Sequence, residues 1–274
     1  MVEKFKVFIT LFLKKVLKSR SSMSVGTFKS YEDALNFCDG IGYEASEVVK
    51  VVIEKNQIFR DQMVTSGVVS LDTLRTMIGV GALNAEPTLR VLDFGGGGGS
   101  HYSIVRAVLG ADRDIRWNVV ETSTMVKAAN ERLAGGGIKF FDDIQKAATD
   151  LGQIDLVFTS GALQYTPDPL AALSSLLAVK ADHLFITRTT FSEGPGQVIS
   201  VQTSKLSENG PGPLPTAMEN GKIRYPVTFA SKLKALNLIR KSYIVRFSVD
   251  EERDAYTING ESFNMYGYFC DLKK

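Results

Sequence analysis

The chain has 274 residues, of which 44% are hydrophobic and 23% are charged, so it contains ample apolar material for a folded core. Its formal net charge of +2 argues against nucleic acid as a partner, because that would require a clustered basic face. The cysteines, Cys38 and Cys270, and the histidines, His101 and His183, lack the spacing of a disulfide framework or a metal centre. We therefore expect a folded cytoplasmic protein without a bound metal.

Residues 1–22 predict a basic amphipathic helix. Lysines surround apolar residues that recur at helical spacing, namely Phe5, Phe8, Ile9, Phe12 and Val16. The continuous apolar run, residues 7–13, is far shorter than the roughly 20 residues that a membrane-spanning helix needs. The helix therefore either lies on a membrane, at its inner surface, or packs against its own domain or a partner chain.

Residues 23–85 predict a helical cap in front of the main domain. Ser30 is placed to cap a helix over residues 31–37, and the Asp39-Gly40 pair is placed to end it. The apolar positions of residues 48–58 predict a second helix, and no strand-like alternation interrupts this region. We expect the cap to cover the functional site of the domain that follows.

Residues 86–274 alternate between short apolar runs and helical patterns. Because parallel strands need crossover connections, this alternation predicts an α/β Rossmann-like fold with a mostly parallel, doubly wound sheet. Residues 241–249 and 262–271 predict an antiparallel strand pair at the end of the sheet, and the Gly/Pro/Ser-rich residues 192–215 predict an irregular segment, a candidate lid. The parallel strands are expected over residues 89–94, 116–120, 138–141, 154–158 and 183–187, and the helices over 102–109, 124–133, 144–151 and 169–177.

Five consecutive glycines, residues 95–99, follow the first of these strands. Glycine permits positive φ and lets the backbone approach a ligand, while N–H groups at the next helix start bind the ligand's polar groups. The dinucleotide-binding pattern GxGxxG requires a glycine at the position of Ser100, whereas the shorter pattern GxGxG is matched by the turn. Asp93, just before the turn, attracts a cationic sulfonium and repels a pyrophosphate, so it favours a sulfonium ligand. The turn residues expected to bind the ligand are Gly95, Gly96, Gly97 and Gly99.

Acidic residues follow the next two predicted strands. Glu121 is placed to accept hydrogen bonds from both ribose hydroxyls of a nucleoside, or else it caps the following helix. Asp142 and Asp143 end the third strand, where one of them accepts from an adenine amino group or caps the helix that begins at Ile144. Both positions suit adenosine.

Polar residues also follow the fourth and fifth predicted strands. Ligands bind at the carboxyl ends of the strands in open α/β sheets, so Ser160, Gly161, Gln164 and Tyr165 are expected to line a pocket, although Tyr165 is equally suited to pack the crossover helix. Arg188 either holds an anionic acceptor or pairs with an acid at the surface.

The segments VLDFGGGGGSHY, VVET and SGALQYTPDP resemble class I S-adenosylmethionine-dependent methyltransferases, and more narrowly a bacterial family linked to surface-polysaccharide biosynthesis. The resemblance covers most of the chain, from FKSYEDAL to KIRYPVTF. It implies that the glycine turn and Asp93 hold the methionine portion of S-adenosylmethionine, Glu121 the ribose, and Asp142 or Asp143 the adenine. The run of five glycines and the following His101 differ from the family's more mixed turn, which leaves the backbone path open.

The resemblance implies methyl transfer by direct displacement to a small-molecule or sugar-type acceptor, with positioning supplying much of the acceleration. A general base helps when the acceptor is a hydroxyl, and the candidates are His101, Tyr165 and Glu193. For His101 the favoured interpretation is a solvent-exposed residue at a helix start, because no partner for it is visible in the sequence. Competing hypotheses are an NAD(P)-dependent oxidoreductase, which Ser100 disfavours, and a non-catalytic cofactor-binding protein of the same fold. The candidate acceptor-binding residues are Gln164, Arg188, Gln197 and Tyr225, with Gln202 nearby.

Overall fold

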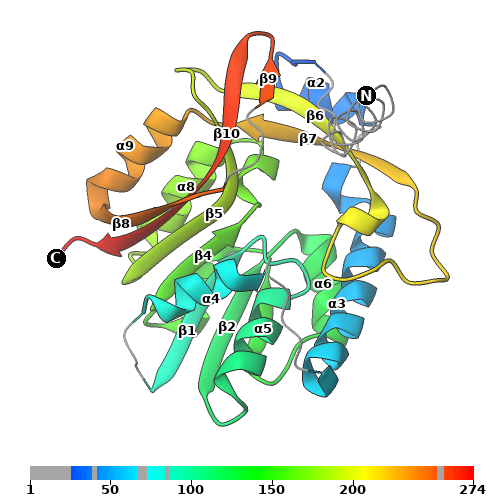
Figure 1. Cartoon of the computed structure of the whole chain (residues 1–274), viewed down its shortest axis with the longest axis vertical. Coiled ribbons are helices and arrows are strands. Elements are labelled where there is room, and N and C mark those ends of the chain that lie inside the picture. The colour runs from blue at the N-terminus through cyan, green and yellow to red at the C-terminus, as the bar shows by residue number, and fades with distance from the viewer. Residues whose placement is uncertain (1–25, 39–41, 67–72, 84–86, 252–255) are drawn as a thin grey trace, which may run out of the picture.

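The computed structural model describes residues 26–38, 42–66, 73–83, 87–251 and 256–274, so the helix predicted over residues 1–22 lies outside the described residues. The larger sheet has the strand order β3-β2-β1-β4-β5-β10-β8, with β9 paired to β10 (Figure 1). The five strands β1 to β5 are parallel to one another, and the order reverses at β1, as in Rossmann-like sheets. The predicted fold class is confirmed.

The parallel strands and their crossover helices follow the predicted alternation closely. Helices α6, α7 and α8 begin at side-chain caps, because Thr122, Asp143 and Asp168 each accept a hydrogen bond from a backbone N–H of the first turn. The strands are β1 Thr88–Phe94, β2 Asp114–Val120, β3 Ile138–Phe141, β4 Leu156–Ser160 and β5 His183–Ser192. The helices are α5 Ser100–Leu109, α6 Ser123–Arg132, α7 Ile144–Leu151 and α8 Pro169–Ala178.

Each face of this sheet is covered by its own layer of helices. Neighbouring strand residues point to opposite faces, so Val91 packs in a core with α5 and α6, whereas Leu92 packs in a second core with α7 and α8. Trp117 of β2, the only tryptophan of the chain, is fully buried in the first core. The intrinsic fluorescence of Trp117 therefore reports on the integrity of this core.

The predicted antiparallel pair is confirmed at the end of the sheet. Helix α9, Lys232–Ser242, leads into β8, Tyr243–Asp250, and the chain returns through β9, Tyr256–Ile258, and β10, Glu261–Leu272. Strand β10 lies between β5 and β8 and is antiparallel to both, so the last strand of the chain inserts inside the sheet rather than at its edge.

The prediction that residues 192–215 form an irregular segment is wrong for part of this range. Residues Val198–Lys205 form β6, which pairs along its whole length with β7, Lys222–Phe229, in a separate two-stranded sheet. The 3-10 turn η4, Leu206–Glu208, follows β6. The alternation within VISVQTSK was obscured by the Gly/Pro-rich segments on either side, and the partner strand of β6 was not recognised in the sequence.

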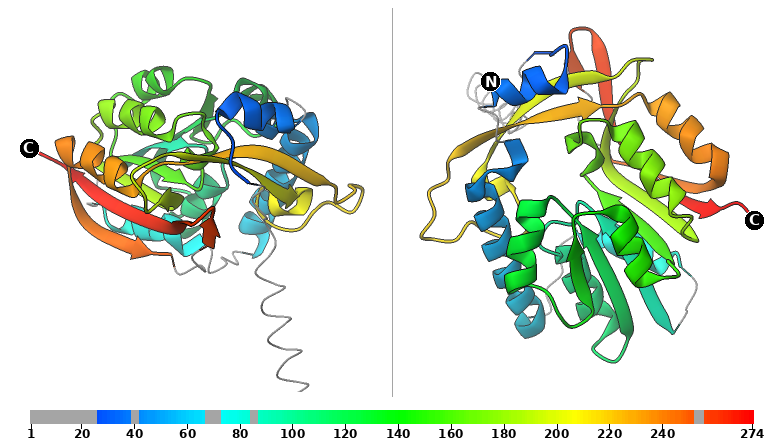
Figure 2. Two further views of the ribbon diagram at one scale, coloured as in Figure 1. Left: turned by 90° about the horizontal axis from the view of Figure 1, so that it is seen from above. Right: turned by 180° about the vertical axis from the view of Figure 1, so that it is seen from behind.

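The described part of residues 23–85 is largely helical, as predicted. Ser30 caps α2, Tyr31–Phe37, by accepting a hydrogen bond from the backbone N–H of Asp33 at 3.0 Å. Helix α2 lies against β6 and β7 (Figure 2), whereas α3 packs into the main core, so the domain boundary at residue 85 stays a prediction. The remaining elements are η1 Gly42–Glu44, α3 Ser46–Ser66 and α4 Leu74–Gly81.

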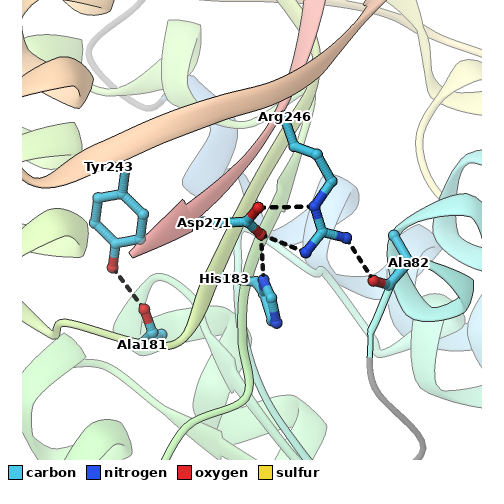
Figure 3. A network of polar contacts seen from close by, with 6 residues as sticks. All are labelled: Ala82, Ala181, His183, Tyr243, Arg246 and Asp271. Carbon is cyan, nitrogen blue, oxygen red and sulfur yellow. Dashed lines mark hydrogen bonds and ion pairs between the residues drawn. The ribbon is translucent and has the colours of Figure 1, made fainter. Parts of the chain in front are cut away.

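A polar network ties the last strands of the sheet to the end of α4 (Figure 3). The carboxylate of Asp271 accepts two hydrogen bonds from Arg246, at 2.6 and 2.7 Å, and lies 2.8 Å from Nδ1 of His183. Arg246 also donates to the carbonyl oxygen of Ala82 at 2.8 Å, and the Tyr243 hydroxyl donates to Ala181 at 2.9 Å. These contacts link β5, β8 and β10 near the end of the chain.

Replacing Asp271 with asparagine is expected to lower the free energy of unfolding by about 1 kcal/mol at pH 7, because the acid is about a third exposed and its ion pair is partly screened. Burial alone would raise the pKa of Asp271, but the bonds from Arg246 and His183 outweigh it and hold the pKa below 3.8. A depressed pKa stabilises the fold above the unfolded-state value and ceases to do so as the pH falls through the folded-state value. Urea unfolding followed by Trp117 fluorescence should therefore show the two proteins converging in stability below pH 3.8, and a constant difference would contradict the assignment.

Candidate functional site

A cavity of about 1730 Å³ opens at the carboxyl ends of β1, β2, β4 and β5. Its opposite wall comes from α3, η1, β6 and β7, through residues such as Asn56, Tyr43, Gln202 and Tyr225. Single small-molecule sites typically measure about 300–1,000 Å³, so this cavity has room for two ligands side by side. Its position matches the place at which open α/β sheets bind ligands.

Most of the residues predicted to form the site line this cavity. Four of the predicted residues do not: Asp93 is fully buried beneath the glycine turn, Gly99 packs against β3, and Glu193 and Gln197 lie outside the lining. The predicted residues that line the cavity are Gly95, Gly96, Gly97, His101, Glu121, Asp142, Asp143, Ser160, Gly161, Gln164, Tyr165, Arg188 and Tyr225.

The five glycines of the turn have different structural requirements. Gly95, Gly97 and Gly99, which form the GxGxG pattern, have φ values of +71°, +57° and +83°, in the region that favours glycine. Gly96 and Gly98 lack this requirement, but a Cβ at either would lie 2.6 Å from a side-chain carbon, that of Asp93 or of Asn56. Gly99 also abuts Ile138, so it serves the packing of α5 on β3.

Glu121 connects the glycine turn to the start of α6. Its two carboxylate oxygens accept hydrogen bonds from the backbone N–H groups of Gly97, at 2.9 Å, and Thr122, at 3.0 Å. Thr122, and not Glu121, caps α6. Burial raises the pKa of Glu121 above 4.5, while the two backbone hydrogen bonds oppose that rise. Each oxygen keeps further acceptor capacity, and the residue lines the cavity, so Glu121 is placed to receive two hydroxyl donors.

The structure separates the roles of the two aspartates after β3. Asp143 caps α7 by accepting a hydrogen bond from the backbone N–H of Lys146 at 2.8 Å. Asp142 instead accepts from the Lys146 ammonium at 3.2 Å, and this hydrogen bond lowers the pKa of Asp142 below 3.8. Both residues line the cavity, but Asp142 does not cap a helix, and its carboxylate is ionised at neutral pH.

His101 has a partner that the sequence did not reveal. Its Nδ1 lies 2.9 Å from Oδ2 of Asp93, which also accepts a hydrogen bond from Nε1 of Trp117 at 3.0 Å. The imidazole ring packs edge-on against Phe158, with 4.9 Å between ring centroids. A carboxylate at Nδ1 favours the tautomer in which Nδ1 carries the proton, which leaves Nε2 as the basic atom. Asp93 therefore acts on the cavity through His101 and not by direct contact with a ligand.

Asp93→Asn is expected to lower the free energy of unfolding by about 1–3 kcal/mol, because its amide group would have a buried donor without an acceptor. Oδ1 of Asp93 is buried and has no hydrogen-bond partner among the described residues, so an amide nitrogen gains nothing there. Asp112→Asn, in an exposed turn, is the matched control, with an expected change within about 0.5 kcal/mol. If the two substitutions changed the free energy of unfolding equally, the Asp93 carboxylate would have no structural role.

Three tyrosines from separate elements form the aromatic wall of the cavity. Tyr43, Tyr165 and Tyr225 contact one another, with ring centroids 5.0 to 5.6 Å apart. The Tyr165 hydroxyl donates to Gln202 at 3.2 Å, and the Tyr225 hydroxyl donates to Ser204 at 3.0 Å. Burial raises the pKa of all three tyrosines above 10, so they are protonated hydrogen-bonding groups and not bases near neutral pH.

Two buried acceptors on the cavity walls have no hydrogen-bond partner among the described residues. They are Oδ1 of Asn56, on α3 beside the glycine turn, and Oε1 of Gln164, after β4. Buried polar atoms are normally satisfied, so each is available to a donor group of a ligand. Asn56 and Tyr43 were not predicted as site residues from the sequence, and only the packing of α3 and η1 brings them to the cavity.

The structure does not bring Glu193 and Gln197 to the cavity. Glu193 forms an ion pair with Lys232 at 2.8 Å and accepts a hydrogen bond from the Tyr266 hydroxyl at 2.5 Å. Gln197 is exposed just before β6. Neither residue is part of the function proposed below.

The described ranges lack both a metal centre and a membrane-spanning helix. These ranges contain no group of three or more His, Cys, Asp or Glu side chains arranged to hold a metal ion. No helix within the same ranges is both long and apolar enough to cross a bilayer.

Comparison with known proteins finds similarity in fold. No protein-family model and no curated protein matches the chain. A S-adenosylmethionine-dependent methyltransferase from Clostridium acetobutylicum is 9% identical, with a TM-score of 0.46 over 81% of this chain and 99% of that one. An O-methyltransferase family protein from Burkholderia thailandensis is 16% identical, with a TM-score of 0.41 over 83% of this chain and 63% of that one.

An arsenic(III) S-adenosylmethionine methyltransferase from Chlamydomonas reinhardtii is 14% identical, with a TM-score of 0.40 over 83% of this chain and 73% of that one. At these identities and TM-scores the similarities assign no function to this chain.

Proposed function

We propose that this protein binds S-adenosylmethionine in the cavity and catalyses transfer of its methyl group to a small-molecule or sugar-type acceptor. The observation that carries the proposal is the link between Glu121 and the glycine turn. A partly buried carboxylate that lines the cavity accepts hydrogen bonds from Gly97 and Thr122 and keeps acceptor capacity for a ribose.

The residues around the turn fit the cofactor. The cavity is lined by the backbone of residues 95–98, and the unpartnered oxygen of Asn56 beside it suits the α-ammonium group of the methionine portion. In this proposal Asp142, after β3, accepts a hydrogen bond from the adenine amino group. The cavity acids Glu121, Asp142 and Asp143 attract a sulfonium cation and repel a pyrophosphate, which disfavours NAD(P) at this site.

When bound, S-adenosylmethionine supplies an electrophilic methyl group, and the protein's part is to align the acceptor with it. The protonated tyrosines and Gln164 hold and orient the acceptor by hydrogen bonds and ring contacts. For a hydroxyl acceptor, Nε2 of His101 takes the proton, while Asp93 fixes the imidazole ring and stabilises its positive charge.

Calorimetric titration tests the proposal directly. S-adenosylmethionine and S-adenosylhomocysteine are expected to bind the purified protein, and NAD and NADP are not. Binding of a nicotinamide cofactor alone would overturn the proposal. Binding of the sulfonium compound without methyl transfer to any member of a broad acceptor panel would identify a cofactor-binding protein that lacks the reaction.

A further inference from the structure

A strained arginine lines the cavity at the carboxyl end of the parallel strands. Arg188 belongs to β5 but has a φ of +52°, in the left-handed region. A side chain clashes with its own backbone in this conformation, so glycine is the favoured residue there. Strained residues that persist near ligand sites commonly have a function that compensates for the strain.

The strain at Arg188 comes from a β-bulge between β5 and β10. Tyr266 pairs with Thr189 and Tyr268 pairs with Ile186, so two residues of β5, Thr187 and Arg188, face one residue of β10. A bulge bends the strand and redirects a side chain that regular pairing would place elsewhere. Here the redirected side chain is that of Arg188, which lines the cavity.

A buried acid holds the bulge in place. Glu251, which is only 4% exposed, accepts hydrogen bonds from the backbone N–H of Arg188, at 3.0 Å, and from the Thr187 hydroxyl. Its second oxygen accepts from Nε of Arg75 at 2.6 Å, so the charge of Glu251 is balanced by Arg75. The guanidinium of Arg188 therefore takes no part in holding its own backbone.

The guanidinium of Arg188 has no acidic partner within the described part of the chain. The side chain is exposed to the cavity beside Gly161, and its positive charge opposes the rise in the pKa values of Tyr43 and Tyr165. The cavity acids that follow β2 and β3 are separated from β5 by β1 and β4 in the strand order. The cavity thus has an acidic end and a cationic end.

We propose that Arg188 binds a carboxylate or phosphate group of the methyl acceptor, so that the acceptor is a small organic anion. Its planar fork matches either group with two parallel hydrogen bonds, and the tyrosine wall formed by Tyr43, Tyr165 and Tyr225 packs against the rest of the molecule. The anion's role as acceptor rests on the proposed methyl transfer, whereas the anion site itself does not.

The test uses small aromatic probes on the full chain, with and without S-adenosylhomocysteine. Benzoate and phenyl phosphate are the anionic probes, and benzamide is the neutral one, each titrated by ligand-observed NMR. Arg188→Gln is expected to weaken binding of both anions at least tenfold and leave benzamide unchanged, since it removes the charge. Arg188→Lys should give an intermediate loss, because lysine keeps the charge without the fork.

Arg188→Gly separates function from folding. Glycine adopts a positive φ without strain, and this substitution also deletes the guanidinium. The Tm should therefore stay equal or rise, while binding of the anions is lost. A large fall in the Tm would show that Arg188 serves the fold, and would overturn the proposal.

Three other outcomes overturn it. The first is that benzoate and phenyl phosphate bind wild type and Arg188→Gln equally. The second is that neither anion binds wild type at up to about 10 mM. The third is that Arg188→Gln weakens binding of S-adenosylhomocysteine, which would assign the guanidinium to the cofactor's own carboxylate. Failure of wild type to bind S-adenosylhomocysteine, with the anion results intact, would overturn the methyltransferase proposal and leave an anion site.

Discussion

Replacing Glu121 with glutamine is expected to weaken binding of S-adenosylhomocysteine between tenfold and about a hundredfold. The glutamine amide nitrogen would face either the N–H of Gly97 or that of Thr122, where the wild-type carboxylate accepts at 2.9 and 3.0 Å. It would also present a donor where a ribose hydroxyl needs an acceptor. Calorimetric titration measures the effect, and Glu131→Gln, on the exposed face of α6, is the matched control, expected to change nothing.

The protonation of Glu121 should also make the binding of S-adenosylhomocysteine depend on pH. Burial raises the pKa of Glu121 above 4.5, and the carboxylate accepts from two hydroxyls better than the protonated acid does. Affinity for S-adenosylhomocysteine should therefore fall as the pH is lowered, beginning above 4.5, whereas Glu121→Gln should lack this step. An affinity that is independent of pH in both proteins would show that Glu121 does not contact the ligand.

Replacing Gly95 with alanine is expected to lower the free energy of unfolding by about 3 kcal/mol. Gly95 has a φ of +71°, and a Cβ there would overlap the Cβ of Ala162, in the loop after β4. Neither atom lies at the end of a flexible side chain, so the loops after β1 and β4 would have to separate. Urea unfolding followed by the fluorescence of Trp117 measures the loss.

Two variants separate the strain from the clash. Gly260→Ala, at a φ of +83° in the turn between β9 and β10 with no atom near the added Cβ, carries only the backbone strain and should cost about 1 kcal/mol. Adding Ala162→Gly to Gly95→Ala removes the overlap and should recover the difference between the two. If Gly95→Ala costs no more than Gly260→Ala, the contact with Ala162 does not require a glycine.

The strand and helix segments of the parallel core were predictable because their signals are local. Each parallel strand is a short apolar run, and Asp168 and Asp143 cap the helices that follow, as sequence rules describe. By contrast, β6 was missed because its apolar alternation has meaning only beside β7, which begins 24 residues after β6 starts. The pairing of two distant segments produces no pattern within the sequence of either segment.

The sequence by itself determined the order of the parallel strands and their crossover helices, the GxGxG turn and the acids after β2 and β3, because periodicity, positive φ and strand ends are properties of neighbouring residues. The tertiary structure alone decided which side chains act together. It buried Asp93 against Trp117 and His101, paired Glu193 with Lys232 away from the cavity, and placed Glu251 where it holds the strained backbone of Arg188. Each of these contacts joins residues from different elements, and its energy depends on burial and distances that exist only once the sheet has formed.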